Sequence, residues 1–287
     1  MIPTIKSYFS GAGGLDLGLN QAGCDVIQSL EYDSTCSDTL RKNFKHSVVT
    51  TDIRTAMVLD QVRSDVSAFT FPCTKYSAIA DIHGTRTGDE LFLHAFRHVA
   101  LELPEMFVVE NVPGMRKFKV VMECFTKIPQ YYVNVFCPID ALTWLPQRRE
   151  RLIVIATRKP FSISAPVAKR KINLSDIIQP GAKVDIPDYV GRRLSGKYRD
   201  LPIISDPTKG DVAPTCVAHY SKDVSTRLIK DGKRIRPYTV REYARLQGFP
   251  DTFEFAGSDR DAYRQIGNAV AIPVGQWIGE QVIRYFN

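Results

Sequence analysis

The chain lacks the sequence features of secreted, membrane-spanning and zinc-binding proteins. No stretch approaches the roughly 20 apolar residues that a membrane-spanning helix requires, and no positively charged segment followed by an apolar one opens the chain. The six cysteines among 287 residues are scattered, without the close spacing of a zinc knuckle. Internal repeats and low-complexity tracts are also absent from the sequence. We therefore expect a protein that folds without disulfides in a reducing, cytoplasmic compartment.

Histidine is scarce, and the one suggestive pair does not indicate a metal site. His94 and His98 lie four residues apart in an expected helix and could chelate a metal in principle, but no cysteine is near them in the sequence. We expect a solvent-facing or capped pair and no bound metal.

Composition indicates a packed protein with a preference for anionic partners. Hydrophobic residues make up 44% of the chain, and its length suits one large α/β domain with a smaller one attached. The formal net charge is +7, which suits a polyanion such as nucleic acid.

Strand-like and helix-like patterns alternate through the first half of the chain. Strands are expected at 4–9, 26–31, 68–71 and 106–110, and helices at 15–22, 34–44 and 91–101. This alternation predicts a parallel sheet with helices on both faces and a ligand crevice beyond the carboxyl ends of the strands.

The character of the sequence changes near Pro160. Prolines, short strand-like runs and basic clusters follow, and the last segment reads as a turn and an apolar helix. We expect a catalytic and cofactor-binding domain at 1–160, a smaller domain at 161–260, and a segment at 261–287 that returns to the first domain.

Three features that follow expected strands favour a nucleotide-like ligand. The glycine-rich run 11–14 allows close backbone approach, although it lacks the full dinucleotide spacing and also fits a plain tight turn. Glu31 stands where an acidic residue hydrogen-bonds ribose, and equally suits a surface strand end. The carboxylate of Asp52 can accept a hydrogen bond from the amino group of an adenine. Together they favour an adenosine-containing cofactor.

A cysteine and a later carboxylic acid add a chemical possibility. Cys73 ends an apolar strand and opens a loop, where it can present a thiolate, and Glu110 ends another strand, where it can protonate what the thiolate attacks. The alternative for Cys73 is an inert buried thiol.

Nearly the whole chain resembles the DNA (cytosine-5) methyltransferases. The runs that carry the resemblance are Phe9-Ser10-Gly11-Ala12-Gly13-Gly14, Glu31-Tyr32-Asp33, Asp52-Ile53, Pro72-Cys73, Glu110-Asn111-Val112, Gln147-Arg148-Arg149-Glu150-Arg151, Arg241-Glu242-Tyr243-Ala244-Arg245-Leu246-Gln247-Gly248-Phe249-Pro250 and Gln265-Ile266-Gly267-Asn268-Ala269-Val270. Each run is modest alone, but their order and number are highly specific.

The resemblance implies an α/β fold with a Rossmann-like, S-adenosylmethionine-dependent methyltransferase domain and a smaller target-recognition domain. The cofactor-binding residues that it implies are Phe9, Ser10, Gly11, Gly13, Gly14, Leu15, Glu31, Tyr32, Asp52, Ile53, Pro72, Asn268, Ala269 and Val270.

The same resemblance implies a reaction on a cytosine flipped out of double-stranded DNA, within a short target sequence. Cys73 is expected to add to C6 while Glu110 acts on N3, and Arg149 or Arg151 is expected to hold the O2 side of the base. The segment 74–89 is expected to form a lid, with Ser77 and Arg86 on the DNA, and Thr215 to lie in the recognition region. The compact architecture further implies a monomeric bacterial or phage enzyme that acts on the nucleoid, without metal or membrane.

Three departures and two rival functions accompany this interpretation. Compared with the family pattern, Phe71 stands in place of a proline, Thr74 stands in place of a glutamine, and the segment 88–92 lacks the arginine that usually precedes it. These departures concern the rate and the target sequence more than the type of reaction. A tRNA cytosine-5 methyltransferase would share the chemistry. A non-catalytic DNA-binding regulator would more readily have lost Cys73, Glu110 or the glycine loop.

Overall fold

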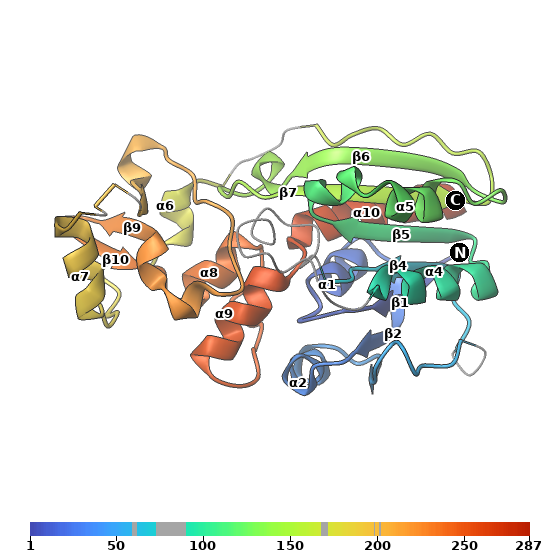
Figure 1. Cartoon of the computed structure of the whole chain (residues 1–287), viewed down its shortest axis with the longest axis horizontal. Helices are drawn as coiled ribbons and strands as arrows, with labels where there is room; N and C mark the ends of the chain where they lie inside the picture. Colours follow the sequence, from blue (N-terminus) through green and yellow to red (C-terminus); the bar gives the residue numbers. More distant parts are fainter. Residues whose placement is uncertain (59–61, 73–89, 168–171, 198, 201) are drawn as a thin grey trace.

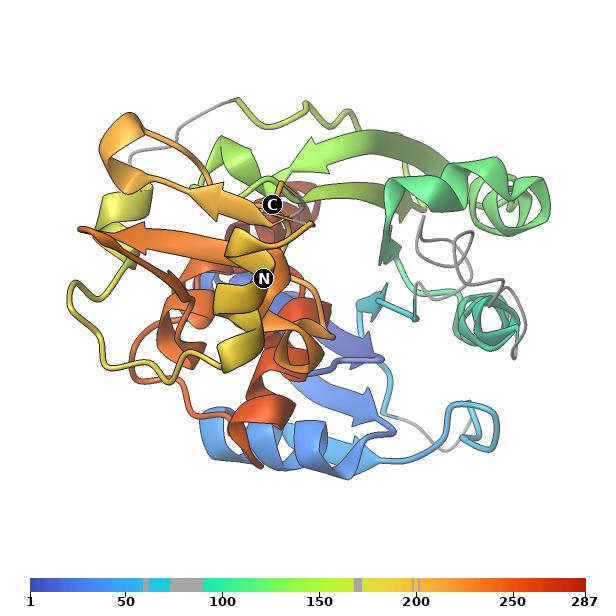
Figure 2. The same cartoon turned by 60° about the vertical axis from the view of Figure 1, so that its left-hand side comes forward.

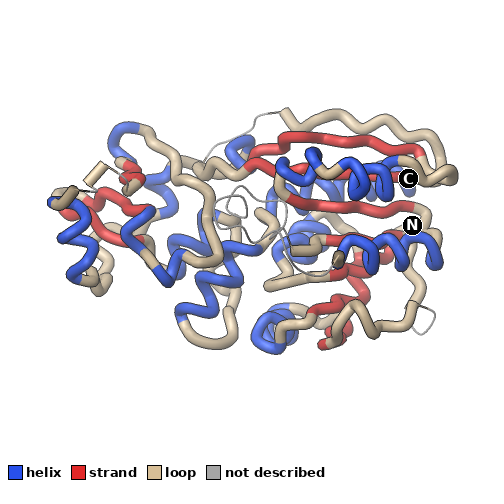
Figure 3. The backbone as a smooth tube through the Cα atoms, in the orientation of Figure 1, coloured by secondary structure: helices blue, strands red, loops and turns tan. Residues whose placement is uncertain are grey.

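The computed structural model describes residues 1–58, 62–72, 90–167, 172–197, 199–200 and 202–287. Two units of unequal size are built from these residues, each around its own sheet (Figures 1 and 3). The larger unit holds the amino and carboxyl termini.

In the described residues, the larger sheet has seven strands in the order β3-β2-β1-β4-β5-β7-β6. The strands are β1 (Thr4–Tyr8), β2 (Asp25–Glu31), β3 (Ser47–Thr50), β4 (Val66–Phe69), β5 (Met106–Asn111), β6 (Tyr132–Asp140) and β7 (Glu150–Thr157). β1 to β5 pair in parallel, as expected, whereas β7 runs antiparallel to both of its neighbours. The parallel sheet expected from the first half of the chain is therefore confirmed, and β6 and β7, which the sequence pattern did not include, add an antiparallel edge because the chain turns from β6 into β7 without a crossover helix.

Helices cover both faces of this sheet (Figure 1). They are α1 (Gly14–Gln21) and α10 (Ile272–Phe286) on one face, α4 (Leu91–Glu102) and α5 (Lys119–Thr126) on the other, and α2 (Ser34–Asn43) beside β2 and β3. All residues of β4 and β5 are buried, as expected of strands covered on two sides. No helix among the described residues is long and apolar enough to cross a bilayer.

The order of the parallel strands reverses between β1 and β4. From β1 the chain winds outward to β2 and β3, and it then returns to β4 on the other side of β1. Open α/β sheets bind ligands beyond the carboxyl ends of strands at such a reversal. The segments that follow Tyr8 and Phe69 therefore frame the place where a ligand is expected.

The smaller unit contains a three-stranded sheet in the order β10-β9-β8, which comes forward with α7 in Figure 2. Its elements are α6 (Leu174–Ile177), α7 (Asp188–Ser195), β8 (Ile203–Ser205), β9 (Arg227–Asp231), β10 (Arg234–Pro237) and α8 (Val240–Leu246); α9 (Asp259–Asn268) leads back to the larger unit. A hydrophobic cluster around Tyr220, Tyr243 and Phe249 joins this unit to Ile266 of α9 and Ile272 of α10.

His98 differs from its sequence expectation. Its ring is fully buried against Tyr8, 4.8 Å away between centroids, and its Nδ1 lies 3.9 Å from the carboxylate of Glu102. The pair with His94 is therefore not solvent-facing, because α4 turns His98 toward β1.

Candidate active site

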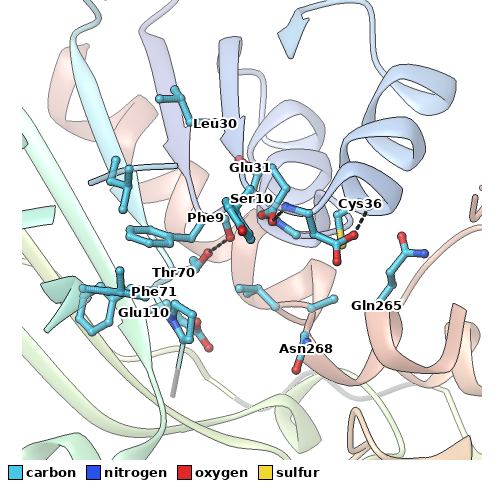
Figure 4. Close-up of a pocket in the computed structure, with 18 of the residues that line it drawn as sticks. Phe9, Ser10, Leu30, Glu31, Cys36, Thr70, Phe71, Glu110, Gln265 and Asn268 are labelled. Atoms are coloured by element: carbon cyan, nitrogen blue, oxygen red, sulfur yellow. Dashed lines mark hydrogen bonds between the residues drawn. The ribbon is translucent and has the colours of Figure 1, made fainter. Parts of the chain in front are cut away.

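A cavity of about 450 Å³ lies beyond the carboxyl ends of β1 and β4 (Figure 4). Most of its walls come from the ends of the five parallel strands, β1 to β5, and from α9 with the segment that follows it. The lining residues are Phe9, Ser10, Gly11, Leu30, Glu31, Tyr32, Asp33, Cys36, Thr51, Asp52, Ile53, Arg54, Thr70, Phe71, Pro72, Leu91, Glu110, Asn111, Val112, Arg151, Arg264, Gln265, Asn268, Ala269 and Val270. The volume suits a ligand the size of a nucleoside derivative.

The loop after β1 has an unusual backbone. Phe9 has φ = 60° and Gly11 has φ = 56°; the positive φ of Phe9 is a strained conformation that its surroundings must hold. Thr70 donates a hydrogen bond to the carbonyl oxygen of Phe9 (2.9 Å), and the amide of Ser10 donates to that of Leu30 (3.3 Å). The neighbouring strands thus fix the loop at the cavity wall.

The structure does not bring Gly13, Gly14 and Leu15 to the cavity lining, although the sequence placed them among the cofactor-binding residues. Gly14 instead allows close packing, because a Cβ there would lie 2.3 Å from the carbonyl oxygen of Val270. Leu15 is buried in the core between α1 and the sheet. These residues shape the loop and the opposite wall.

Glu31 orders the centre of the cavity. Its carboxylate accepts hydrogen bonds from the amides of Gly11 (2.7 Å) and Asp33 (2.8 Å). Burial raises the pKa of Glu31, and these amide hydrogen bonds oppose the shift. One carboxylate therefore ties the glycine loop to the end of β2 while facing the cavity.

Asp52 and Tyr32 lie toward the rim. Arg54 holds both oxygens of Asp52, with Nε at 3.0 and 2.9 Å, and its hydrogen bonds lower the pKa of that carboxyl. Tyr32 is 72% exposed although it contributes to the wall. Ile53 is buried beside them. The ionised carboxylate of Asp52 and the apolar side chain of Ile53 thus belong to the same part of the cavity rim.

An ion pair that the sequence analysis did not single out crosses the lining. Nη1 of Arg264 on α9 lies 2.8 Å from Oδ2 of Asp33, which also caps the start of α2. Asp33 lies in one of the motif runs that carry the resemblance, and Arg264 directly precedes another, so the sequence offered both as candidate site residues. Their contact could not be read from the sequence, because the two residues are 231 positions apart.

Glu110 and Arg151 form an ion pair in the cavity wall. Nε of Arg151 lies 2.8 Å from Oε1 of Glu110. Burial raises the pKa of Glu110, while the positive charges of Arg151 and Arg149 act against this shift. The next residue, Asn111, donates to the carbonyl of Phe71 (3.0 Å) and so ties the end of β5 to the segment that carries Pro72.

Arg149 is placed differently from Arg151. Its side chain is 1% exposed and does not line the cavity. Nη1 donates to the carbonyl of Cys216 (2.8 Å), and Nη2 donates to those of Gly267 (3.0 Å) and Ala269 (2.8 Å). Arg149 therefore joins the larger unit, the smaller unit and the segment that ends in the cavity wall.

The remaining site residues lie elsewhere. Thr215 is half-buried and donates to the carbonyl of Arg148 (2.7 Å), at the junction of the two units. Cys73, Ser77 and Arg86 lie outside the described residues, as does the expected lid at 74–89. The described Pro72 directly precedes Cys73 and lines the cavity.

Comparison with known proteins places this architecture in a family. A family model described as C-5 cytosine-specific DNA methylase matches residues 4–200 and 208–284. Among curated proteins, the chain is 28% identical to the type II methyltransferase M.FnuDI of Fusobacterium nucleatum, over 97% of this chain and 93% of that protein. It is 30% identical to M.NlaX of Neisseria lactamica, over 97% of this chain and 95% of that protein.

Solved structures show the same fold. The Entamoeba histolytica methyltransferase EhMeth superposes with a TM-score of 0.84 at 18% identity, covering 100% of this chain and 99% of that one. The S. pombe Dnmt2 methyltransferase superposes with a TM-score of 0.78 at 17% identity, covering 99% of each chain. The family match over nearly the whole chain confirms the resemblance seen in the sequence: the chain belongs to the C-5 cytosine-specific DNA methylases and is a DNA (cytosine-5) methyltransferase.

Proposed function

We propose that the protein transfers the methyl group of S-adenosylmethionine to C5 of a cytosine flipped out of a short target sequence in double-stranded DNA. One observation carries the proposal. A single cavity is lined by the carboxylates suited to an adenosine, those of Glu31 and Asp52, and by the buried acid Glu110. Pro72, the residue before Cys73, lies in the same wall.

The residues present fit the cofactor. The carboxylate of Glu31 suits ribose hydroxyls, the Asp52 carboxylate suits an exocyclic amino group, and the side chains of Phe9 and Ile53 offer apolar surface. Asn268 and Val270 close the opposite wall. When bound, S-adenosylmethionine supplies an electrophilic methyl group on a sulfonium.

Glu110 activates the base. A raised pKa favours the protonated carboxyl, which donates to N3 of cytosine and withdraws electrons from C6. Arg151, beside Glu110, is the described arginine suited to hold O2 of the base. Arg149 contributes positive charge and holds the walls in place.

Cys73 supplies the nucleophile. Its thiolate forms a bond to C6, and the electrons of the C5–C6 double bond move to C5. C5 would then take the methyl group as the sulfur–methyl bond of the sulfonium breaks, which leaves S-adenosylhomocysteine. Loss of the proton from C5 then re-forms the double bond and expels the Cys73 thiolate, so the enzyme returns to its starting form.

The smaller unit is proposed to read the target. Thr215 lies at its junction with the larger unit, and basic side chains of this unit suit contacts with phosphates. A single chain carries all of the cofactor, acid and nucleophile residues assigned to the reaction, so we propose that a monomer suffices.

A trapping experiment tests this function. Wild-type protein, S-adenosylmethionine and a mixed-sequence duplex containing 5-fluorocytosine should give a denaturation-stable protein–DNA adduct, because C5 then carries no removable proton. Cys73→Ser should give no adduct yet retain cofactor binding. The tRNA alternative is tested in parallel with 5-fluorocytosine-containing tRNA. An adduct with tRNA alone, or one that survives the Cys73→Ser substitution, contradicts the proposal.

A further inference from the structure

A turn after β3 carries the adenine end of the proposed cofactor site. The stretch 51–58 forms neither strand nor helix, and its first four residues line the cavity. The carbonyl oxygen of Asp52 closes the turn, because it accepts hydrogen bonds from the amides of Thr55 and Ala56, each at 3.0 Å. These bonds fix the start of the turn, but they do not engage the carbonyls of Ile53 and Ala56.

Arg97 of α4 binds those two carbonyls. Its Nη2 donates to the carbonyl oxygen of Ile53 at 2.9 Å and to that of Ala56 at 2.8 Å. The positive charge of the guanidinium strengthens both hydrogen bonds. One side chain, 44 and 41 positions away along the chain, therefore holds the turn at two points.

Apolar packing joins the same two elements. Ile53 and Ala56 are buried in one hydrophobic cluster with Phe92 and Ala95 of α4. Apolar packing is non-directional, whereas hydrogen bonds require a particular geometry. The packing thus keeps the turn against α4, and the two bonds from Arg97 fix its orientation.

The orientation of the turn sets the position of the Asp52 carboxylate. Arg54 lies between the two carbonyls that Arg97 binds. It donates to Asp52 from its amide at 2.9 Å and from Nε at 3.0 and 2.9 Å. A rotation of the turn would therefore move Arg54 and the Asp52 carboxylate together.

We propose that Arg97 is a positioning residue that holds the turn at 52–56 so that the Asp52 carboxylate meets the amino group of adenine, and that it thereby sets the preference of the site for an adenosine cofactor. The inference rests on the proposed function, because it takes S-adenosylmethionine as the cofactor. It adds a residue that lies outside the cavity lining and outside the motif runs, and that acts through Asp52.

The test compares two ligands that differ at one position of the base. S-adenosylhomocysteine carries the amino group, whereas S-inosylhomocysteine carries an oxygen there, which cannot donate to Asp52. Titration calorimetry with wild-type protein should show a preference of roughly tenfold or more for S-adenosylhomocysteine, because a site built for a donor rejects a ligand without one. Arg97→Met keeps the apolar stem and removes the donors. Its Kd for S-adenosylhomocysteine should rise roughly three- to tenfold, and the preference should fall by at least about threefold.

Two matched variants accompany Arg97→Met. Both hydrogen bonds come from one nitrogen, so the single ammonium nitrogen of Arg97→Lys can replace them, and the preference should stay within about twofold of wild type. Arg63→Met makes the same change at an exposed arginine outside the cavity lining and should leave both Kd values within about twofold. In Arg97→Met, kcat at saturating cofactor should stay within about twofold while KM rises with Kd.

Several outcomes overturn the inference. An unchanged preference in Arg97→Met would do so even if the protein melts earlier, because a purely structural role lowers stability without changing the choice between two bases. A loss of preference in Arg97→Lys as large as that in Arg97→Met would also contradict it. If Arg97→Met does not fold, Arg97→Gln, which ends two bonds short of Nη2, tests the same step, and an unchanged preference there contradicts the inference. A wild type that prefers S-adenosylhomocysteine but leaves DNA unmethylated contradicts the proposed function alone.

Discussion

Replacing Arg149 with methionine should loosen the junction of the two units. The guanidinium is buried and donates to three backbone carbonyls, on Cys216, Gly267 and Ala269. Methionine matches the arginine side chain out to Nε and has no donor. The carbonyls of Cys216 and Gly267 then lose a charged partner, whereas that of Ala269 keeps a hydrogen bond from Gln247 at 3.2 Å.

The expected loss follows from these contacts. A buried carbonyl left without its partner costs about 1–3 kcal/mol. Two such carbonyls give a loss of roughly 2–6 kcal/mol in the free energy of unfolding, and the carbonyl of Ala269 adds little because it keeps its bond from Gln247. At about 2 °C per kcal/mol for a chain of this length, the midpoint should fall by roughly 4–12 °C.

Thermal unfolding measured by circular dichroism, with and without S-adenosylhomocysteine, checks this prediction. Arg148→Met is the matched control, because Arg148 is the exposed neighbour and its loss should change stability by less than about 0.5 kcal/mol. An Arg149→Met protein that melts like wild type but has lost turnover would contradict this structural role of Arg149. Arg149 would then act on the base, as the sequence had left open.

Three further predictions concern the cavity. Reversing either charge of the Asp33–Arg264 pair should raise the Kd for S-adenosylhomocysteine several-fold. The double swap Asp33→Arg/Arg264→Asp should restore part of the lost affinity. If calorimetry shows that the two losses of affinity simply add, a direct role for the pair is excluded. Gly14→Ala places a Cβ 2.3 Å from the carbonyl of Val270, so it should cost about 1–3 kcal/mol and raise KM for the cofactor; an unchanged KM would contradict this. Glu110→Gln should lower kcat by roughly 10²–10⁴ and remove the alkaline fall of the pH–rate profile. A raised pKa keeps the Glu110 proton to higher pH, and activity is lost only as pH rises through it.

Local sequence patterns predicted the strands that carry the site. The runs ending at Tyr8, Glu31 and Asn111 were apolar and bounded by glycine or polar residues, and the structure places their ends within a residue or two of expectation. Their carboxyl ends had to meet because parallel strands share one edge. Glu31, Asp52 and Glu110 were therefore brought to one cavity by topology alone.

The reversal at the edge of the sheet was not predicted. β7 lies antiparallel between β5 and β6, and strand direction depends on the connection rather than on the residues of the strand. The β6–β7 link is too short for a crossover helix, and that length was the available signal.

Side-chain partners across long separations were also beyond the sequence. Arg149 and Arg151 share one motif run, but their side chains have different partners. The guanidinium of Arg149 contacts the backbone carbonyls of 216, 267 and 269, whereas that of Arg151 pairs with Glu110 in the cavity wall. Such partners become visible only when the elements are assembled.

The proposed reaction is tested most directly by base-resolution sequencing for 5-methylcytosine after incubation of the protein with S-adenosylmethionine and a mixed-sequence DNA duplex. We expect 5-methylcytosine in one recurring sequence context with wild-type protein and none with Cys73→Ser. Methyl groups on another atom of the base, methylation that persists in Cys73→Ser, or methylation of tRNA in place of DNA would contradict the proposed reaction.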